Sequence, residues 1–228
     1  MNNGARTSLG EPPTRADRVG DRMPAADDLA RLDERVLHLV FLVREALAGA
    51  TVALLGGEPA TGRSIVAADE AIDDLTAELD RVVWSLLDAG AHDPSALRYL
   101  VAVLLILPEL ERSADLAEHI AQRAVGNLGP EMSPVSRGIV QRMAEIALEM
   151  WRNVADAYAR RRAAAGSLDE ADEELDILHD RLVREASLDA MPAPIAVQVT
   201  LLARFYERLG DHAVNLARRI EDLPPVAS

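Results

Sequence analysis

The sequence of 228 residues contains no cysteine, which excludes disulfide bonds and thiolate metal sites. Aromatic residues make up only 3% of the chain, against 49% for hydrophobic residues as a whole, so a core must be built mainly from Ala, Leu, Val and Ile. Sheet proteins usually carry more aromatic and β-branched side chains. The composition therefore favours packed helices.

Basic residues are scarce: 24 face 38 acidic residues, and the formal net charge is -14. Such a charge repels phosphate backbones and anionic lipid surfaces, which argues against nucleic acid as a partner. The longest apolar runs, such as Leu100 to Pro108, fall far short of the roughly 20 residues of a membrane-spanning helix. The N-terminus lacks the apolar segment of a secretion signal. We expect a cytoplasmic protein with no direct membrane insertion.

Apolar residues recur at spacings of three and four, the pattern of amphipathic helices. Asp93 before Pro94 is typical of a helix cap followed by the first helical position, and Ser133 before Pro134 repeats it. Gly166 is predicted to close one helix, and a capping box of Ser167 and Glu170 to open the next. The predicted helices cover about residues 28–55, 62–89, 94–125, 134–165, 168–190 and 195–223.

The order of these segments, three helices, a break at Gly126–Pro130 and three more, indicates a tandem arrangement. We predict an all-α fold of two tandem three-helix bundles, over residues 28–126 and 133–223. Residues 1–27 mix Gly, Pro, Arg and Asp without an apolar period, so they bury too little to offset the entropy of ordering. They are expected to form a disordered tail.

Carboxylate pairs at a spacing of four repeat between the two halves. The pairs are Asp69 with Asp73, Glu111 with Asp115, Asp172 with Asp176, and Glu207 with Asp211. The second-helix pairs are separated by 103 residues (172−69, 176−73), and the third-helix pairs by 96 (207−111, 211−115). Each pair shares one helix face.

Like charges at this spacing cost a helix roughly 0.2–0.5 kcal/mol, so their repetition calls for a compensating cation. That cation is either arginine or a metal. If the second and third helices of each half are neighbours, two pairs converge into four carboxylates suited to a hard metal. The alternative is a solvated acidic face neutralised by Arg112 and Arg208.

The segment from Arg204 to Asn215 reads R-F-Y-E-R-L-G-D-H-A-V-N. It resembles the signature R-Y-x-E-R-x-G-D-H-A-x-N of the PhoU family, whose repeats also carry an upstream E/D-x-x-x-D, found here in the second- and fifth-helix pairs. The resemblance covers about Asp28 to Leu223. Within it, the residues that would support the site or contact a partner are Arg112, Arg204, Tyr206, Arg208, His212 and Asn215.

The resemblance implies two three-helix bundles related by pseudo-twofold symmetry, often dimeric, with multinuclear iron or zinc clusters at the acidic motifs. It also implies a regulatory protein, not an enzyme, that restrains a Pst-type phosphate ABC transporter and its sensor histidine kinase. The first repeat departs from the pattern, with Ala114, Leu116 and His119 where the family prefers Gly, His and Asn. Metal is therefore expected more firmly in the second repeat.

An alternative is a carboxylate-bridged metal protein with redox or storage activity. Helical bundles of that kind use Glu-x-x-His motifs, and the nearest approximation here is Asp176-x-x-His179. The glycine-rich stretch from Gly56 to Arg63 lacks the ending of a P-loop. The sequence therefore favours regulation by binding.

Overall fold

The computed structural model describes residues 26–90, 93–162, 165–188 and 191–224. Within these residues every regular element is a helix and there is no strand, which confirms the predicted all-α class. The helices are α1 (Ala26–Gly56), α2 (Pro59–Asp88), α3 (Pro94–Val125), α4 (Leu128–Glu131), α5 (Pro134–Arg160), α6 (Ala165–Ala186) and α7 (Ala193–Glu221). The predicted tail lies outside the described residues, except that Ala26 and Asp27 already belong to α1.

Two helix starts lie where the sequence predicts them. The Asp93 carboxylate accepts hydrogen bonds from the backbone N–H groups of Ser95 and Ala96, at 2.7 and 3.0 Å. The Ser133 hydroxyl accepts one from the Ser136 N–H at 3.0 Å. Both caps satisfy N–H groups that a helix leaves without an internal partner.

Three boundaries differ from the prediction. The second helix begins at Pro59, whose fixed φ suits a first turn, and the predicted break contains the one-turn α4. α5 ends at Arg160, and α6 begins at Ala165, so the boundary predicted at Gly166 and Ser167 is wrong. The reason is a tertiary partner: the Ala165 N–H donates to the Glu221 carboxylate at the end of α7, at 3.1 Å.

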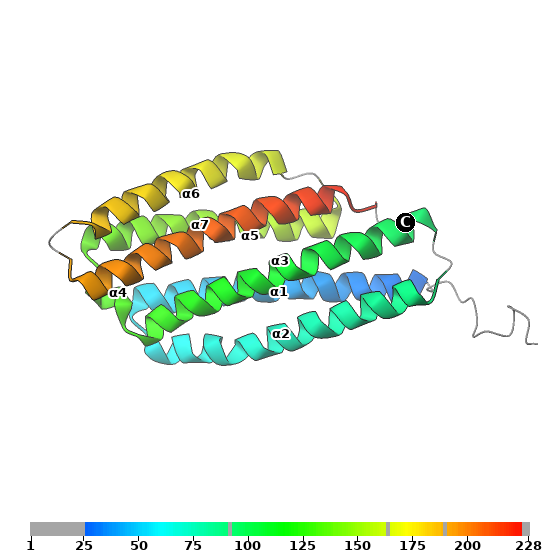
Figure 1. Cartoon of the computed structure of the whole chain (residues 1–228), viewed down its shortest axis with the longest axis horizontal. Helices are drawn as coiled ribbons and strands as arrows, with labels where there is room; N and C mark the ends of the chain where they lie inside the picture. The colour runs from blue at the N-terminus through cyan, green and yellow to red at the C-terminus, as the bar shows by residue number, and fades with distance from the viewer. Residues whose placement is uncertain (1–25, 91–92, 163–164, 189–190, 225–228) are drawn as a thin grey trace, which may run out of the picture.

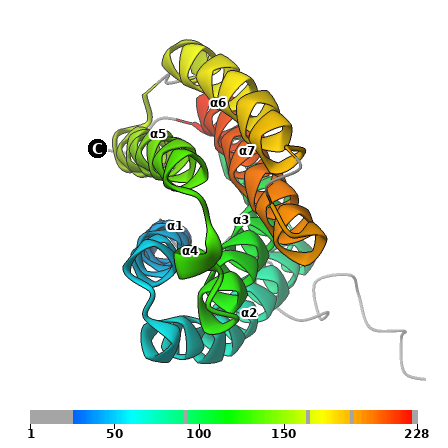
Figure 2. The same ribbon diagram turned by 90° about the vertical axis from the view of Figure 1, so that its left-hand side faces the viewer.

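The helices form two bundles that lie side by side along the long axis of the molecule (Figure 1). α1, α2 and α3 pack together, and α5, α6 and α7 pack together. The bundles meet where α3 contacts α7 and α1 contacts α5, as the end view shows (Figure 2). The second and third helices of each bundle, which carry the acidic pairs, are therefore neighbours.

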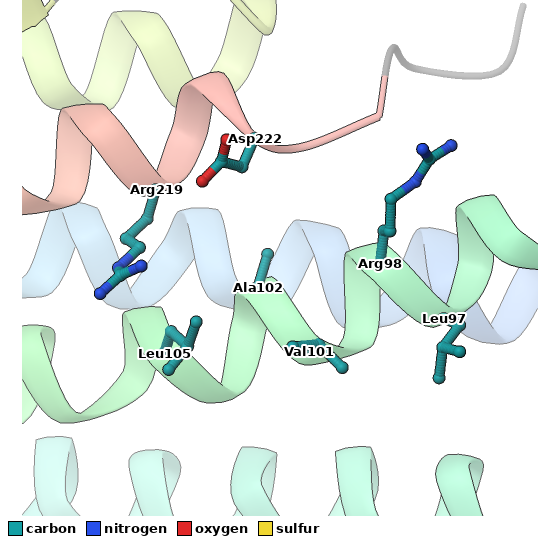
Figure 3. A pocket seen from close by; sticks show the side chains of 7 residues that line it. All are labelled: Leu97, Arg98, Val101, Ala102, Leu105, Arg219 and Asp222. Atoms are coloured by element: carbon teal, nitrogen blue, oxygen red, sulfur yellow. The ribbon is translucent and has the colours of Figure 1, made fainter.

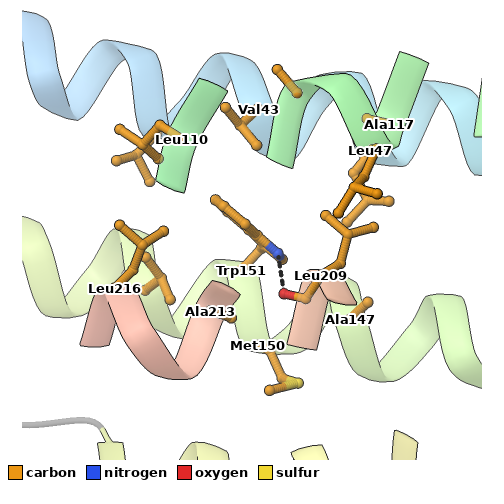
Figure 4. Packing of buried hydrophobic residues seen from close by; sticks show 14 of the residues in the cluster. Val43, Leu47, Leu110, Ala117, Ala147, Met150, Trp151, Leu209, Ala213 and Leu216 are labelled. Carbon is orange, nitrogen blue, oxygen red and sulfur yellow. Dashed lines mark hydrogen bonds between the residues drawn. The ribbon is translucent and has the colours of Figure 1, made fainter. Parts of the chain in front are cut away.

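One continuous core joins the bundles. Trp151 on α5 is fully buried, and its indole N–H donates to the Leu209 carbonyl of α7 at 3.1 Å (Figure 4). Thr51 on α1 and Tyr206 on α7 share a buried hydrogen bond of 2.8 Å. Polar side chains inside a core need such partners, because an unpaired buried group costs about 1–3 kcal/mol. These bonds fix α7 against both α1 and α5.

α1 is long and apolar enough, by length and composition, to cross a membrane. Its apolar face is buried in the bundle, with Leu32, Val36 and Leu39 at most 1% exposed. The opposite face carries exposed charged residues such as Arg31 and Glu45. α1 thus has the sidedness of a core helix.

Candidate functional site

The first acidic cluster lies between α2 and α3. Carboxylate oxygens of Asp69, Asp73 and Asp115 all lie within 4.8 Å of one another. Burial raises the pKa of Asp69 to about 6, and repulsion from Asp73, Glu118 and Asp115 adds to it. The pKa of Asp73 is also raised, by burial first and then by Asp115. Three of the four carboxylates predicted for this half are therefore brought together.

The fourth carboxylate of this half differs from the prediction. Glu111 is exposed and stands outside the group of three. Glu118 is half-buried and close enough to Asp69 to raise its pKa. It lies three residues after Asp115 on the same face of α3, a spacing that could have identified it from the sequence.

The second cluster lies between α6 and α7 and brings together the four predicted carboxylates. Burial, Asp211, Asp176 and Glu207, in that order, raise the pKa of Asp172 to about 6. The pKa of Glu207 is raised by burial and by Asp211, against the opposing effects of Arg204 and His179. The two clusters therefore share one electrostatic pattern, a half-buried carboxylate surrounded by like charge.

Glu207 holds an unsatisfied oxygen in this cluster. One of its carboxylate oxygens accepts a hydrogen bond from Arg204 at 2.5 Å. The other, Oε2, is buried and has no hydrogen-bond partner. A buried anionic oxygen without a partner is costly, and a bound cation would remove that cost.

Gly210 gives the second cluster its close helix packing. A Cβ at this position would lie 2.6 Å from the Asp172 Oδ1 atom and 2.6 Å from the Leu175 Cδ1 atom. The absence of a side chain lets the Asp172 carboxylate lie directly over the α7 backbone. The matching position in the first repeat is Ala114 (210−114 = 96), which is fully buried.

The two clusters differ in compactness. Among the described residues, the carboxylate oxygens that lie within 4.8 Å of one another are those of the first cluster, from Asp69, Asp73 and Asp115. The second has the fuller sequence signature and the unpartnered Glu207 oxygen. The sequence predicts metal more firmly in the second repeat, whereas the compact grouping of carboxylate oxygens lies in the first.

The supporting motif residues have separate roles. Tyr206 is fully buried in the inter-bundle core, while Arg208 and Asn215 are exposed. Arg112 forms an ion pair with Glu109 at 3.7 Å. Arg204 pairs with Glu207, at the rim of the second cluster.

His212 points away from the second cluster, toward the other bundle. Its Nδ1 atom is hydrogen-bonded to the Ser113 hydroxyl on α3 at 2.9 Å, and its Nε2 atom lies 3.9 Å from a Glu109 oxygen. Burial lowers the pKa of His212, which Glu109 partly opposes. Sequence reasoning missed Ser113 and Glu109, because their partner is about a hundred residues away.

Both halves of the chain match one family model, described as the PhoU domain, over residues 36–124 and 140–220. The chain belongs to the PhoU family. The motif resemblance and the predicted fold class are thus confirmed. Two relatives described as PhoU homologues, accessory proteins of the phosphate-specific transport system, span nearly the whole chain. The Zymomonas mobilis PhoU homologue is 32% identical over 212 residues, covering 90% of this chain and 89% of the relative.

The Rhizobium meliloti PhoU homologue is 28% identical over 200 residues, covering 85% of this chain and 84% of the relative. The crystal structure of PhoU from Pseudomonas aeruginosa superposes with a TM-score of 0.80 at 24% identity, covering 85% of this chain and 95% of that one. The crystal structure of PhoU from Streptococcus pneumoniae superposes with a TM-score of 0.75 at 23% identity, covering 86% of this chain and 94% of that one. At these identities the solved structures establish the shared fold.

Proposed function

We propose that this PhoU protein is a negative regulator of phosphate uptake and of phosphate-responsive two-component signalling. It acts in the cytoplasm, as a homodimer, as an adaptor between the ATPase subunit of a Pst-type ABC transporter and a sensor histidine kinase. The observation that carries the proposal is the PhoU match in both halves, with relatives described as phosphate-transport accessory proteins. The net charge of -14 supports encounter with basic partner surfaces.

A deletion strain tests the regulatory role. In high phosphate, loss of this chain is expected to release alkaline phosphatase repression and alter phosphate uptake, and the wild-type chain is expected to restore both. A pull-down in the same medium should recover the transporter ATPase and the kinase. Unchanged repression and uptake in the deletion strain would reject the regulatory role, and recovery of neither partner would reject the adaptor.

We propose further that each acidic cluster binds a multinuclear iron or zinc centre. The donors fit a hard cation, because they are carboxylate oxygens. In the first cluster the donors are Asp69, Asp73 and Asp115, with Glu118 alongside; in the second they are Asp172, Asp176, Glu207 and Asp211. Bound metal would neutralise the repulsion within each cluster and tie the second helix of each bundle to the third.

Elemental analysis of protein purified without chelator tests the metal proposal. Glu207→Ala with Asp211→Ala is expected to remove the metal held by the second cluster. Glu145→Ala with Glu149→Ala is the matched control, because those residues form an exposed carboxylate pair at the same spacing on α5. Metal at background in the wild type, or equal loss in both double variants, would reject the proposal.

A further inference from the structure

The face of α3 beside the C-terminal end of α7 carries an apolar stripe that the adaptor proposal does not use. Leu97, Val101 and Leu105 are each 45% exposed and follow one another at a spacing of four. With Arg219 of α7 and Asp222, the residue that caps α7, they line an open groove of about 550 Å³ (Figure 3). The stripe runs from Leu97 to Leu105, eight helical steps, which is roughly 12 Å or about two turns.

The groove is basic in a strongly acidic protein. Its charged lining residues are Arg98, Arg219 and Asp222, two cations against one anion, whereas the chain carries a net charge of -14. Arg112 continues the same face, because seven residues beyond Leu105 bring an α-helix back to within about 20°. Arg112 is 60% exposed and forms the ion pair with Glu109 at 3.7 Å. A ligand in the groove therefore meets apolar side chains along its length, with the guanidinium groups of Arg98 and Arg219 and the carboxylate of Asp222 at its edges.

The two repeats differ in the side chains beside this apolar stripe. Val197 and Leu201 on α7 are the counterparts of Val101 and Leu105, each 96 residues later (197−101, 201−105). Beside them, the Phe205 ring lies 5.1 Å from the Arg123 guanidinium carbon and stacks on His119. Glu109 occupies the position equivalent to Phe205, and it faces His212. Arg219, the equivalent of Arg123, is thus left at the edge of the groove without that ring.

We propose that this α3–α7 groove binds an amphipathic helix of a protein partner, with acidic residues flanking an apolar stripe. Two turns of such a helix match the length of the apolar stripe, and its carboxylates complement Arg98 and Arg219. The proposal rests on the adaptor function and adds the chemistry of one partner segment. An anionic membrane is disfavoured by the net charge.

The test uses full-length protein and three labelled helical peptides of about 16 residues (~24 Å). All carry the same leucine stripe, and their flanking residues are Glu, Lys or Gln. By fluorescence anisotropy the Glu peptide is expected to bind most tightly, and more weakly as salt rises. Val101→Glu should weaken the affinity for the Glu peptide about tenfold or more. Val197→Glu, the repeat-matched control at a 56% exposed position, should change it by less than about twofold.

Other outcomes overturn the proposal. They are no saturable binding of the Glu peptide, equal binding of the Lys peptide, or equal effects of the two variants. A self-association that Val101→Glu abolishes in sedimentation would assign the groove to a second copy. Vesicle binding lost in the same variant would assign it to lipid. A deletion strain that keeps repression rejects the regulatory role itself. A Val101→Glu strain that keeps repression, although the variant no longer binds the peptide, rejects only the assignment of the partner segment to this groove.

Discussion

Asp69 and Asp172 occupy equivalent positions in the two repeats, and both have a pKa raised to about 6. In each case burial is the largest cause, followed by neighbouring carboxylates. A raised carboxyl pKa means that the folded chain binds a proton more tightly than the unfolded chain, whose Asp titrates near 3.9. The two residues therefore destabilise the metal-free fold once both are ionised.

For metal-free protein, this contribution to the free energy of unfolding should fall as pH rises from about 4 to about 6, and stay constant above. Asn mimics the protonated carboxyl, so Asp69→Asn with Asp172→Asn should be more stable than wild type at pH 7.5. The difference should close near pH 4. Urea unfolding in the presence of chelator at both pH values measures it. A difference that does not change with pH would contradict the assignment.

Gly210→Ala tests the close approach of α6 to α7. The new Cβ would displace the Asp172 carboxylate toward solvent, so the pKa of Asp172 should fall from about 6 toward its ordinary value. The free energy of unfolding should change little, because two effects oppose each other. Ala gains up to about 1 kcal/mol of helix propensity over Gly, and the contact of the new Cβ with Asp172 and Leu175 offsets that gain. NMR titration of the carboxyl carbons reads the pKa directly.

Ala114→Gly, the reciprocal change in the first repeat, is the control and should leave the Asp172 titration unchanged. An unaltered Asp172 pKa in Gly210→Ala would show that the helices separate without moving the carboxylate.

The sequence predicts cluster residues where the spacing along one helix decides their position. The four carboxylate pairs were found this way, because positions four apart share a face whatever the tertiary structure. The partner of His212 could not be predicted in the same way, because it is Ser113 on a helix of the other bundle. Glu111 shows the same limit: it shares a helix face with Asp115, yet only Asp115 joins the cluster.

At the scale of elements, a network around Asp33 ties three helices together. One Asp33 oxygen of α1 accepts hydrogen bonds from Tyr158 of α5 at 2.8 Å, from Tyr99 of α3 at 3.1 Å, and from Arg161. The Arg161 guanidinium carbon also lies 4.2 Å from the Tyr158 ring centre. Three partners on one oxygen join the first bundle to the end of α5.

Asp33→Ala should lower the free energy of unfolding by about 2–4 kcal/mol, since it leaves the Arg161 charge, 8% exposed, without its counter-ion. The comparison is with Asp156→Ala, an exposed aspartate of α5. Chemical denaturation compares the two. Equal losses in both variants would argue against a structural role for the network.

The same network shows why the α5–α6 boundary was missed. Arg161 adopts a left-handed φ of 49° as α5 ends, although the residue itself is a good helix former. Its partners, Asp33 and the two tyrosines, hold it there. The end of α5 is therefore set by contacts with residues up to 128 positions away in the sequence. Such contacts leave no signal in the residues around Gly166, where the sequence predicts the end of this helix.

At the scale of the molecule, the two bundles share one core and should unfold together. Trp151 lies fully buried at their junction, whereas Trp84 on α2 is 53% exposed. In Trp84→Phe, fluorescence reports only the junction, while circular dichroism reports all helices. The two urea curves should coincide. A junction that melts before the helices would show that the bundles are independent.

The differences between the two repeats also determine how a partner can be oriented on this protein. Two equal halves would offer a partner two equivalent orientations, half a turn apart. Phe205 and Glu109 remove that equivalence, because they place an aromatic ring at one of two equivalent positions and a carboxylate at the other. A helix seated beside Leu105 would then meet the molecule in a single pose, with the Asp69 cluster always toward one side and the Asp172 cluster toward the other. A fold built from two repeats thus presents two non-equivalent sides to a partner.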